Sequence, residues 1–497
     1  MLSTTRTRRP IGITITHIAL AITIGFGALA GAAGYWGVVV APDLTRSPND
    51  AAVIAASRTV ERGEILDRNG RVLARNERDE NGELYRSYAN QAVSQVVGYY
   101  SRRFGSAGLE RAYSAELAGL ATDPLADALR KFGGNPYDPQ DLHLSLDYRL
   151  QRAAIRALGD QKGAVVMMDP TTGEVLAMAS NPTYDASAIA DPRTAEKTFA
   201  ALQDDPDNPL LPRATLGRYV PGSVFKIVTA IAALGSGAIT PETTFREQAE
   251  AGDDGLLVNG FRIREGHSLR RGQALTLPQA TEISSNIFYA LAGLETGGEN
   301  LVDFAGRLGF GAPLPFDLPT AASQVTNGRG EDPGGFVDDV ELANAAYGQG
   351  ETFVTPLQMA LVASTVANDG VLMKPRLVTA LKGKRGIREI GPEQLRRVIS
   401  ADDAQAIQGA MRRAVEGDLG RQFTSGAKVP GVSTAGKSGT AELGGSGEPH
   451  SWFIGFAPVN QPRIAIAVLV ERAGRGGAVA APIGGNLMER YFEEFGQ

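Results

Sequence analysis

The clearest pattern of apolar and polar positions is a set of short strand-like runs that begins near residue 141. The run at 163–177 is apolar on both sides of the polar turn Asp-Pro-Thr-Thr-Gly, which predicts a β-hairpin. Residues 434–458 predict a second hairpin with a Gly-rich tip, and residues 463–471 predict one more strand. We therefore expect an α+β fold with an antiparallel sheet of about five strands. Helices from the middle of the chain should flank the sheet, and a last helix near 486–495 should pack on it.

One long apolar run near the amino terminus differs from these short ones. From Pro10 to Pro42 the chain contains no Asp, Glu, Lys or Arg. A helix of this length exceeds the roughly 30 Å hydrocarbon core of a bilayer, so we expect a transmembrane anchor at residues 10–41. The three arginines before it favour a cytoplasmic tail at residues 1–9 and a single-pass topology that places the rest outside the cell membrane. The alternative is a signal peptide cleaved at Ala28-Leu29-Ala30, but the run exceeds the roughly 7 to 15 residues of a signal core.

Residues 42–140 differ in composition from the rest of the chain after residue 140 and predict a separate, non-catalytic domain. Within them, residues 62–74 predict two short strands around an Asn-Gly turn, and residues 108–117 predict a helix. The rest of this segment is rich in Gly, Pro and polar residues. The change to strand patterns after it sets a boundary, so we expect the catalytic domain at residues 141–497.

Composition excludes several classes of function. The 497 residues carry a net charge of −6 without a continuous basic stripe, so no nucleic-acid partner is expected. The chain has no cysteine and four histidines. Without cysteine there are no disulfides, thiolate metal sites or cysteine nucleophiles, and four histidines argue against a zinc cluster. We expect neither a metal nor a cofactor.

The strongest chemical signal is Ser223 with Lys226 three positions later, at the start of an apolar run. Pro221 and Gly222 break the chain before the serine and Gly235 ends the run, which predicts a helix with the nucleophile at its exposed first turn. Side chains three apart share one helix face, so the Lys226 amine can hydrogen-bond the Ser223 hydroxyl and, if neutral, accept its proton. The helix dipole and burial both favour a neutral amine. The pair therefore predicts a serine acyl-transfer enzyme.

Two further motifs come after this pair in the chain. Residues 284–286 (Ser-Ser-Asn) precede an apolar stretch and predict a loop between helices that presents short polar side chains to a cleft. Residues 437–440 (Lys-Ser-Gly-Thr) begin the second hairpin, where an edge strand offers a lysine and backbone N–H groups to a bound peptide. A second Ser-x-x-Lys at Ser425 lies in a Gly- and Pro-flanked loop, and a second Ser-x-Asn at Ser47 precedes the nucleophile. Neither copy has the right context.

In this order, the three motifs are variants of the signature of penicillin-binding proteins and serine β-lactamases. The chain resembles class B penicillin-binding proteins, the monofunctional D,D-transpeptidases of bacterial cell-wall synthesis, and above all their short actinobacterial type. Further family-like stretches are residues 62–74, 108–113, 163–177, 347–350, 354–359 and 450–458. The resemblance implies a transpeptidase domain of the serine β-lactamase/transpeptidase-like fold and a smaller N-terminal pedestal domain at residues 42–140.

The resemblance also implies a role for each matching catalytic residue. Ser223 would attack the carbonyl between the two terminal D-alanines of a stem peptide, with Lys226 as the general base. Ser284 would relay a proton toward the leaving nitrogen. Asn286 would hold the donor peptide and Lys226, and Lys437 would supply positive potential.

The implied substrate-binding residues are Ser285, Ser438, Gly439 and Thr440. Ser438 and Thr440 would hydrogen-bond the terminal carboxylate of the substrate. The backbone N–H groups of Ser223 and Thr440 would form the oxyanion hole. Pro212 is a departure, since the family often has an asparagine there, so any role of that asparagine cannot be transferred.

The motifs leave three other functions open. A D,D-carboxypeptidase uses the same residues and lets water resolve the acyl-enzyme, whereas a serine β-lactamase is usually a small secreted single domain. A division scaffold or β-lactam sensor with weak catalysis would act through the pedestal and anchor. The implied partners are peptidoglycan stem peptides and their lipid-linked precursor, β-lactam antibiotics, the membrane, and a glycosyltransferase or division-complex protein.

Overall fold

The computed structural model contains two compact units. The first comprises Met1–Gly63 and Tyr113–Gln140, and the second comprises Glu64–Ala112 and Asp141–Gln497. The residues whose placement the structure describes are 11–35, 61–80, 82–120, 138–268, 270–331, 334–444 and 447–495. The predicted cytoplasmic tail at residues 1–9 and the Ser-x-Asn copy at Ser47 lie outside these ranges.

The first unit contains two described helices, α1 (Ile11–Tyr35) and α6 (Ser114–Leu117). The α1 helix coincides with most of the apolar run, and its side chains are described at residues 17–29, 31 and 32. Counting only what the structure describes, no helix is long and apolar enough to cross a membrane. The transmembrane anchor and its orientation therefore stay predictions.

The main sheet of the second unit has five antiparallel strands in the order β15-β16-β17-β7-β8. Their bounds are β7 Gly163–Met168, β8 Val175–Asn181, β15 Ala435–Ala441, β16 His450–Ala457 and β17 Ile464–Val470. This confirms the two predicted hairpins and the added strand. Every residue of β7, β8, β16 and β17 is buried, because helices cover both faces of the sheet. Such strands appear in the sequence as continuous apolar runs rather than alternating ones.

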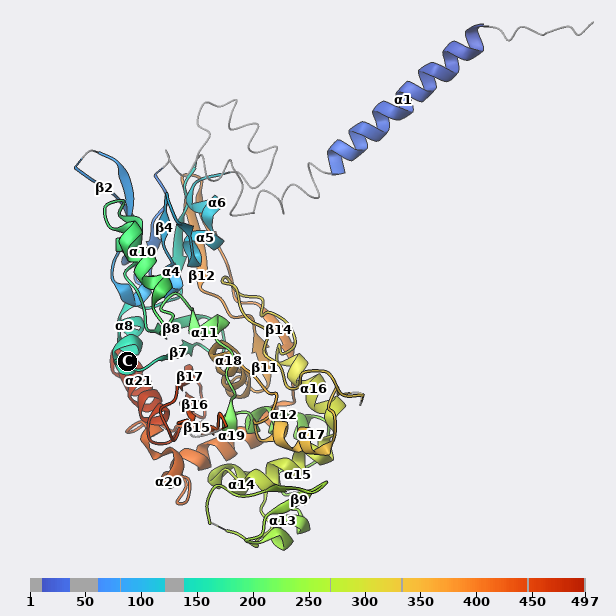
Figure 1. Ribbon diagram of the computed structural model, residues 1–497, viewed down its shortest axis with the longest axis vertical. Coiled ribbons are helices and arrows are strands. Elements are labelled where there is room, and N and C mark those ends of the chain that lie inside the picture. Colours follow the sequence, from blue (N-terminus) through green and yellow to red (C-terminus); the bar gives the residue numbers. More distant parts are fainter. Residues whose placement is uncertain are drawn as a thin grey trace, which may run out of the picture. The chain divides into compact units, whose positions relative to one another are not determined.

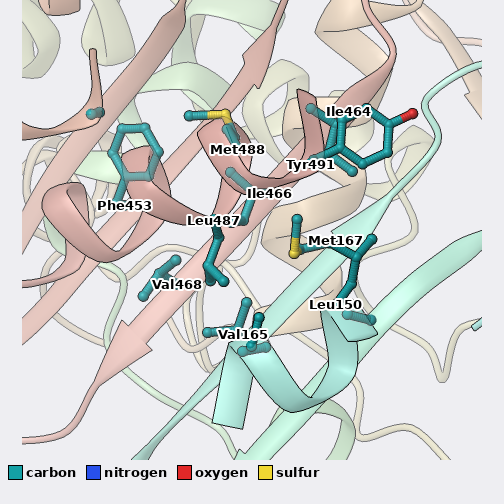
Figure 2. Close-up of a cluster of buried hydrophobic side chains, with 14 of the residues drawn as sticks. Leu150, Val165, Met167, Phe453, Ile464, Ile466, Val468, Leu487, Met488 and Tyr491 are labelled. Carbon is teal, nitrogen blue, oxygen red and sulfur yellow. The ribbon is translucent and has the colours of Figure 1, made fainter. Parts of the chain in front are cut away.

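Helices pack on the two faces of this sheet (Figure 1). The α18 helix (Pro356–Ala367) contacts β16, β17 and β7, while α8 (Tyr148–Leu158) and α21 (Ala480–Phe495) share a buried apolar cluster with the sheet. Figure 2 shows Leu487 and Met488 of α21 near Ile466 and Phe453.

The last helix starts at Ala480, before the predicted start near residue 486. Its first turns contain Gly484 and Gly485, which have low helix propensity and hide the start in the sequence. A Cβ at Gly484 would lie 2.4 Å from the Phe453 ring, so the glycine lets α21 approach β16 closely.

A second sheet brings segments from both predicted domains together. It has six strands in the order β13-β12-β6-β1-β2-β3. Their bounds are β1 Ile65–Leu66, β2 Val72–Arg78, β3 Leu84–Tyr88, β6 Asp141–Leu144, β12 Val378–Gly383 and β13 Gly386–Glu389. The hairpin around the Asn-Gly turn is confirmed. Ile65 of β1 pairs in parallel with Leu142 of β6. The predicted domain boundary at 140/141 therefore separates two strands that are paired in one sheet.

The remaining elements of the second unit surround these sheets. The segment predicted as one helix at 108–117 is interrupted at Tyr113, between α5 in this unit and α6 in the other. The remaining helices are α4 Ser94–Val97, α5 Gly108–Ala112, α9 Ala186–Ala190, α10 Ala195–Asp204, α11 Arg213–Leu216, α12 Lys226–Gly235, α13 Arg246–Ala251, α14 Leu277–Ile283, α15 Asn286–Thr296, α16 Gly298–Arg307, α17 Asp339–Ala346, α19 Ala401–Glu416 and α20 Arg421–Thr424. The short strands are β4 Tyr100–Ser101, β5 Gly105–Ser106, β9 Leu256–Val258, β10 Phe261–Ile263, β11 Val371–Met373 and β14 Gln394–Arg397.

Candidate active site

Ser223 lies in a 3₁₀ turn, η3 (Gly222–Val224), just before α12. The residue is partly exposed and precedes the first residue of the helix, whereas the prediction placed it in the first helical turn. The N–H of Gly222 donates a 2.8 Å hydrogen bond to the carbonyl oxygen of Gly348. A Cβ on Gly348 would lie 1.9 Å from the carbonyl oxygen of Gly222. The turn after α17 therefore holds the nucleophile turn by direct backbone contact.

Lys226 is the first residue of α12 and is completely buried. Its Nζ donates to the carbonyl oxygen of Ser284 at 2.7 Å, to Oδ1 of Asn286 at 2.8 Å and to Oγ of Ser284 at 3.2 Å. Among the hydrogen bonds of the described residues, none joins Lys226 to Ser223, so the expected direct bond is not made in this structure. Three acceptors of the Ser-Ser-Asn motif surround the amine instead.

The environment of Lys226 favours its neutral form. Burial lowers the pKa of Lys226 to about 7, and the negative charge of Glu265 opposes this effect. A neutral amine is therefore well populated near pH 7. An amine in this state can accept a proton from a nearby hydroxyl.

The Ser-Ser-Asn motif is the junction of two helices, as predicted. Ser284 comes after α14 in the left-handed conformation (φ 61°, ψ 43°), and Ser285 caps α15 by accepting from the N–H of Phe288 at 3.1 Å. Ser285 is completely buried, and its hydroxyl also contacts Gln248 and Glu265. The assignment of Ser285 to substrate binding is therefore corrected: its side chain has no surface open to a ligand. Its role in this structure is to cap the helix.

The third motif lies on β15, which is an edge strand of the main sheet, as predicted. Lys437 is buried, and its Nζ donates 2.8 Å hydrogen bonds to Oγ of Ser284 and to the carbonyl oxygen of Ser438. Burial and the nearby charge of Lys226 hold the pKa of Lys437 well below its ordinary value. The amines of both lysines thus meet at the Ser284 hydroxyl.

The backbone of β15 passes directly beside the nucleophile turn. A Cβ on Gly439 would lie 2.9 Å from the carbonyl oxygen of Pro221, and a Cβ on Gly222 would lie 2.6 Å from that of Thr440. In an antiparallel strand the N–H and C=O of one residue point to the same side. The N–H of Thr440 therefore faces the turn that carries Ser223.

The side chains of Ser438 and Thr440 are engaged within the protein. Ser438 is buried, and its Oγ donates to the carbonyl oxygen of Phe423 at 3.2 Å. The hydroxyl of Thr440 accepts from the N–H of Gly476 at 3.3 Å. Thr440 is partly exposed and therefore more accessible to solvent than Ser438.

Residues 163–489 match the family model of the penicillin-binding protein transpeptidase domain. The chain belongs to this family. Residues 62–135 also match the penicillin-binding protein A dimerisation domain. These two matches agree with the resemblance of the sequence to penicillin-binding proteins.

Relatives of this family member match over most of their length. The peptidoglycan D,D-transpeptidase PbpA of Mycolicibacterium smegmatis is 35% identical, over 95% of this chain and 97% of the relative. Penicillin-binding protein A of M. tuberculosis, solved as a penicillin G acyl-enzyme complex, has a TM-score of 0.74 at 31% identity and covers 87% of this chain and 99% of its own. A D,D-transpeptidase domain from Eggerthella lenta has a TM-score of 0.75 at 33% identity and covers 88% of this chain and 99% of its own.

The sequence did not identify every residue that shapes the site. Gly348 belongs to a stretch that resembled the family, but nothing in its pattern indicated contact with the nucleophile turn. The sequence did not indicate that Glu265 and Gln248 belong to the site, because a single carboxylate or amide before a helix is common. The Ser-x-x-Lys copy at Ser425 is excluded, since Lys428 is exposed beyond the short turn η4 (Ser425–Ala427). Among the described residues, no group of three or more His, Asp or Glu side chains could hold a metal ion.

Proposed function

We propose that this protein is a peptidoglycan D,D-transpeptidase that cross-links stem peptides through a serine acyl-enzyme. The Ser223 oxygen bonds to the carbonyl carbon between the two terminal D-alanines, the C–N bond breaks, and D-alanine leaves. An amine of a neighbouring stem peptide then attacks the ester and frees the serine. The observation that supports this most is the convergence of the Lys226 and Lys437 amines on Ser284 beside the Ser223 turn.

The same contacts support a proton route. Neutral Lys226 takes the proton of Ser223 as the new bond forms, because its pKa of about 7 leaves the amine free to act as a base. Ser284 contacts both lysines, so it can pass a proton toward the leaving nitrogen. Asn286 holds the Lys226 amine through its Oδ1.

Backbone N–H groups and the Lys437 side chain bind the oxyanion and the carboxylate of the substrate. The N–H groups of Ser223 and Thr440 stabilise the oxyanion, and one such donor is typically worth about 10² to 10³ in rate. The strand direction at Thr440 supports its part in this pair. The terminal carboxylate of the donor binds near Lys437 and Thr440. A β-lactam, which carries a carboxylate and a strained amide, acylates Ser223 by the same route.

We further propose that residues 10–41 anchor the enzyme in the cell membrane as a single pass, with the catalytic domain outside the cell. The support is the run without Asp, Glu, Lys or Arg and the three arginines that precede it. Exposed apolar side chains on α1 would contact lipid; they are Ile18, Leu20, Ile22, Ile24, Phe26 and Leu29. The full chain should sediment with membranes, and a variant lacking residues 1–41 should not. The substrates of the anchored enzyme outside the cell are the stem peptides of the lipid-linked precursor. Its partner is a glycosyltransferase or a division-complex protein.

Covalent labelling with a fluorescent penicillin tests the proposed enzyme function. The wild type should be labelled, and Ser223→Ala should lose the label while keeping the wild-type melting temperature. Ser425→Ala is a matched control in the second Ser-x-x-Lys copy and should be labelled normally. Retained labelling of Ser223→Ala would place the nucleophile elsewhere.

Product analysis separates transpeptidation from carboxypeptidation. A stem-peptide donor should give a cross-linked product when an amine acceptor is present. Release of D-alanine with only hydrolysed donor, even with the acceptor in excess, would make the protein a D,D-carboxypeptidase.

A further inference from the structure

Arg264 and Glu265, which follow β10, bind both the backbone and the side chain of Asn286. Oε2 of Glu265 accepts a 2.7 Å hydrogen bond from the backbone N–H of Asn286. The carbonyl oxygen of Arg264 accepts a 3.0 Å hydrogen bond from the side-chain Nδ2 of the same asparagine. These two bonds fix the backbone and the amide plane of Asn286, so that its Oδ1 faces the Lys226 amine at 2.8 Å.

The second oxygen of Glu265 has an equally specific partner. The Ser285 hydroxyl accepts from Nε2 of Gln248 at 2.9 Å and from the N–H of Phe288 at 3.1 Å. A hydroxyl has two lone pairs and one proton, so with both lone pairs in use Ser285 donates its proton to Oε1 of Glu265. Both oxygens of Glu265 therefore act as acceptors, the arrangement that a carboxylate offers. The N-terminus of α15 also favours a negative charge at this position.

The charge of Glu265 acts on a base that is completely buried. Lys226 is completely buried, and the groups around its amine are the Lys437 amine from β15, the Tyr289 ring of α15 at 5.7 Å, and Glu265 and His267 after β10. Of these, Glu265 brings a negative charge, and it opposes the loss of the proton that burial promotes.

We propose that Glu265 is a positioning residue for acyl transfer, whose carboxylate fixes Asn286 against Lys226 and stabilises the ammonium that forms when Ser223 gives up its proton. This inference rests on the proposed function of Ser223 and Lys226. In the acylation step the proton moves from Oγ of Ser223 to Nζ of Lys226 as the Ser223 ester bond forms. The positive charge that appears on Lys226 is then faced by the fixed negative charge of Glu265, which needs no reorganisation during the reaction.

Two variants separate the charge of Glu265 from its geometry. Glu265→Gln removes the charge and one of the two acceptors, whereas Glu265→Asp keeps the charge and shortens the reach. The measurement is the rate of acylation by a fluorescent penicillin between pH 5 and pH 9. Glu250→Gln is the control, because Glu250 is an exposed carboxylate on the nearby helix α13.

In the wild type, the rate should rise with pH through an inflection near 7, because the neutral Lys226 amine is the base. Without the charge of Glu265 the pKa of Lys226 falls further, so the inflection of Glu265→Gln should move to lower pH by about one unit. Its plateau rate should fall about tenfold, since Asn286 loses a fixed partner. Glu265→Asp should keep the inflection and lose plateau rate, and Glu250→Gln should match the wild type.

An unmoved inflection in Glu265→Gln would overturn the inference, even if the plateau rate fell, because a purely structural role lowers the rate at every pH equally. If Glu265→Gln does not fold, Glu265→Asp decides: wild-type plateau and inflection together would overturn the positioning role. Failure of the wild type to be labelled would instead contradict the proposed function itself.

Discussion

The Nζ of Lys437 donates a 2.8 Å hydrogen bond to Oγ of Ser284, and the Nζ of Lys226 lies 3.2 Å from the same oxygen. Burial lowers the pKa of each lysine, and the nearby charge of Lys226 lowers that of Lys437 further. The Ser284 hydroxyl can accept from one amine and donate to the other. It therefore provides a path by which one proton moves between the two lysines without crossing bulk water.

The first prediction concerns this hydroxyl. Ser284→Ala should lower the rate of acylation by penicillin about 10²-fold or more, because the proton path between Lys226 and the leaving nitrogen is broken. Stopped-flow or gel-based labelling at several penicillin concentrations measures the rate.

Ser284→Gly is the matched control for backbone strain. Ser284 has φ 61°, a conformation that glycine adopts without strain and that costs other residues about 1 to 2 kcal/mol. The glycine variant should be the more stable of the two in a denaturant titration, yet equally slow. A glycine variant with near wild-type acylation would show that the hydroxyl is not part of the proton path.

The second prediction concerns the base. Lys226→Arg keeps a cation but cannot supply a neutral amine, because the arginine pKa exceeds about 12. Acylation should fall about 10² to 10⁴-fold, and the rise in rate through pH 7 that the wild type shows should disappear. The mechanism gives the sign: the reactive form of Lys226 is the unprotonated one, so its fraction grows as pH rises through the pKa. Labelling that still rises through pH 7 in this variant would assign the base to another group.

The strands of the main sheet could be predicted because each is locally distinct. The run at 163–177 contains its own turn, and β17 is a continuous apolar segment between polar ones. The pairing of distant strands in the second sheet could not be predicted in the same way. Leu142 indicates a strand, but its partners Ile65 and Leu381 lie far away in sequence, and no local pattern encodes such a pairing.

The site shows the same division between local and non-local information. Ser223, the Ser-Ser-Asn motif and Lys437 could be recognised from residue type, order and context. The contact of Asn286 with Lys226 was implied by the family resemblance. The contacts of Lys226 with Ser284 could not be predicted, because spacing on one helix favours Ser223 as the partner of the amine. The burial of Ser285 depends on Gln248, 37 residues earlier.

The third prediction concerns the contact behind the nucleophile turn. Gly348→Ala places a Cβ 1.9 Å from the carbonyl oxygen of Gly222, so the turn that carries Ser223 must move. We expect a loss of about 1 to 3 kcal/mol in the free energy of unfolding and a large fall in acylation. Equilibrium unfolding and penicillin labelling measure the two effects.

Gly350→Ala is the control for this substitution. Gly348 and Gly350 both have positive φ, at 87° and 71°, so alanine is strained at either position. At Gly350, however, the nearest atom to an added Cβ is 3.8 Å away. Gly350→Ala should lose some stability and keep its acylation rate. Equal loss of acylation in the two variants would mean that backbone strain in this loop, rather than contact with Gly222, governs the turn.

The fourth prediction concerns the connection between Ser284 and Lys437. Glu282, two residues before Ser284, has a side chain that is 2% exposed and accepts from Nε of Arg413 and from the N–H of Leu419 at 3.1 Å. Arg413 belongs to α19, which also packs on β15, so this ion pair joins the Ser-Ser-Asn loop to the strand of Lys437.

Arg413→Ala should therefore lower the free energy of unfolding by more than the loss of a surface ion pair does, because it leaves the buried Glu282 carboxylate with one partner. Removing one member of a fully buried pair costs about 3 to 5 kcal/mol, and the 45% exposure of the Arg413 side chain reduces the expected loss to about 1 to 3 kcal/mol. Arg412→Ala, on the same helix, breaks an exposed pair with Glu416 and should cost about 0.5 kcal/mol or less. Acylation should fall only in Arg413→Ala, because Arg413 pairs with Glu282, two residues before Ser284, whereas Arg412 pairs with Glu416. If both variants acylate at the wild-type rate while Arg413→Ala is destabilised, the ion pair supports the fold and has no part in aligning Ser284 with Lys437.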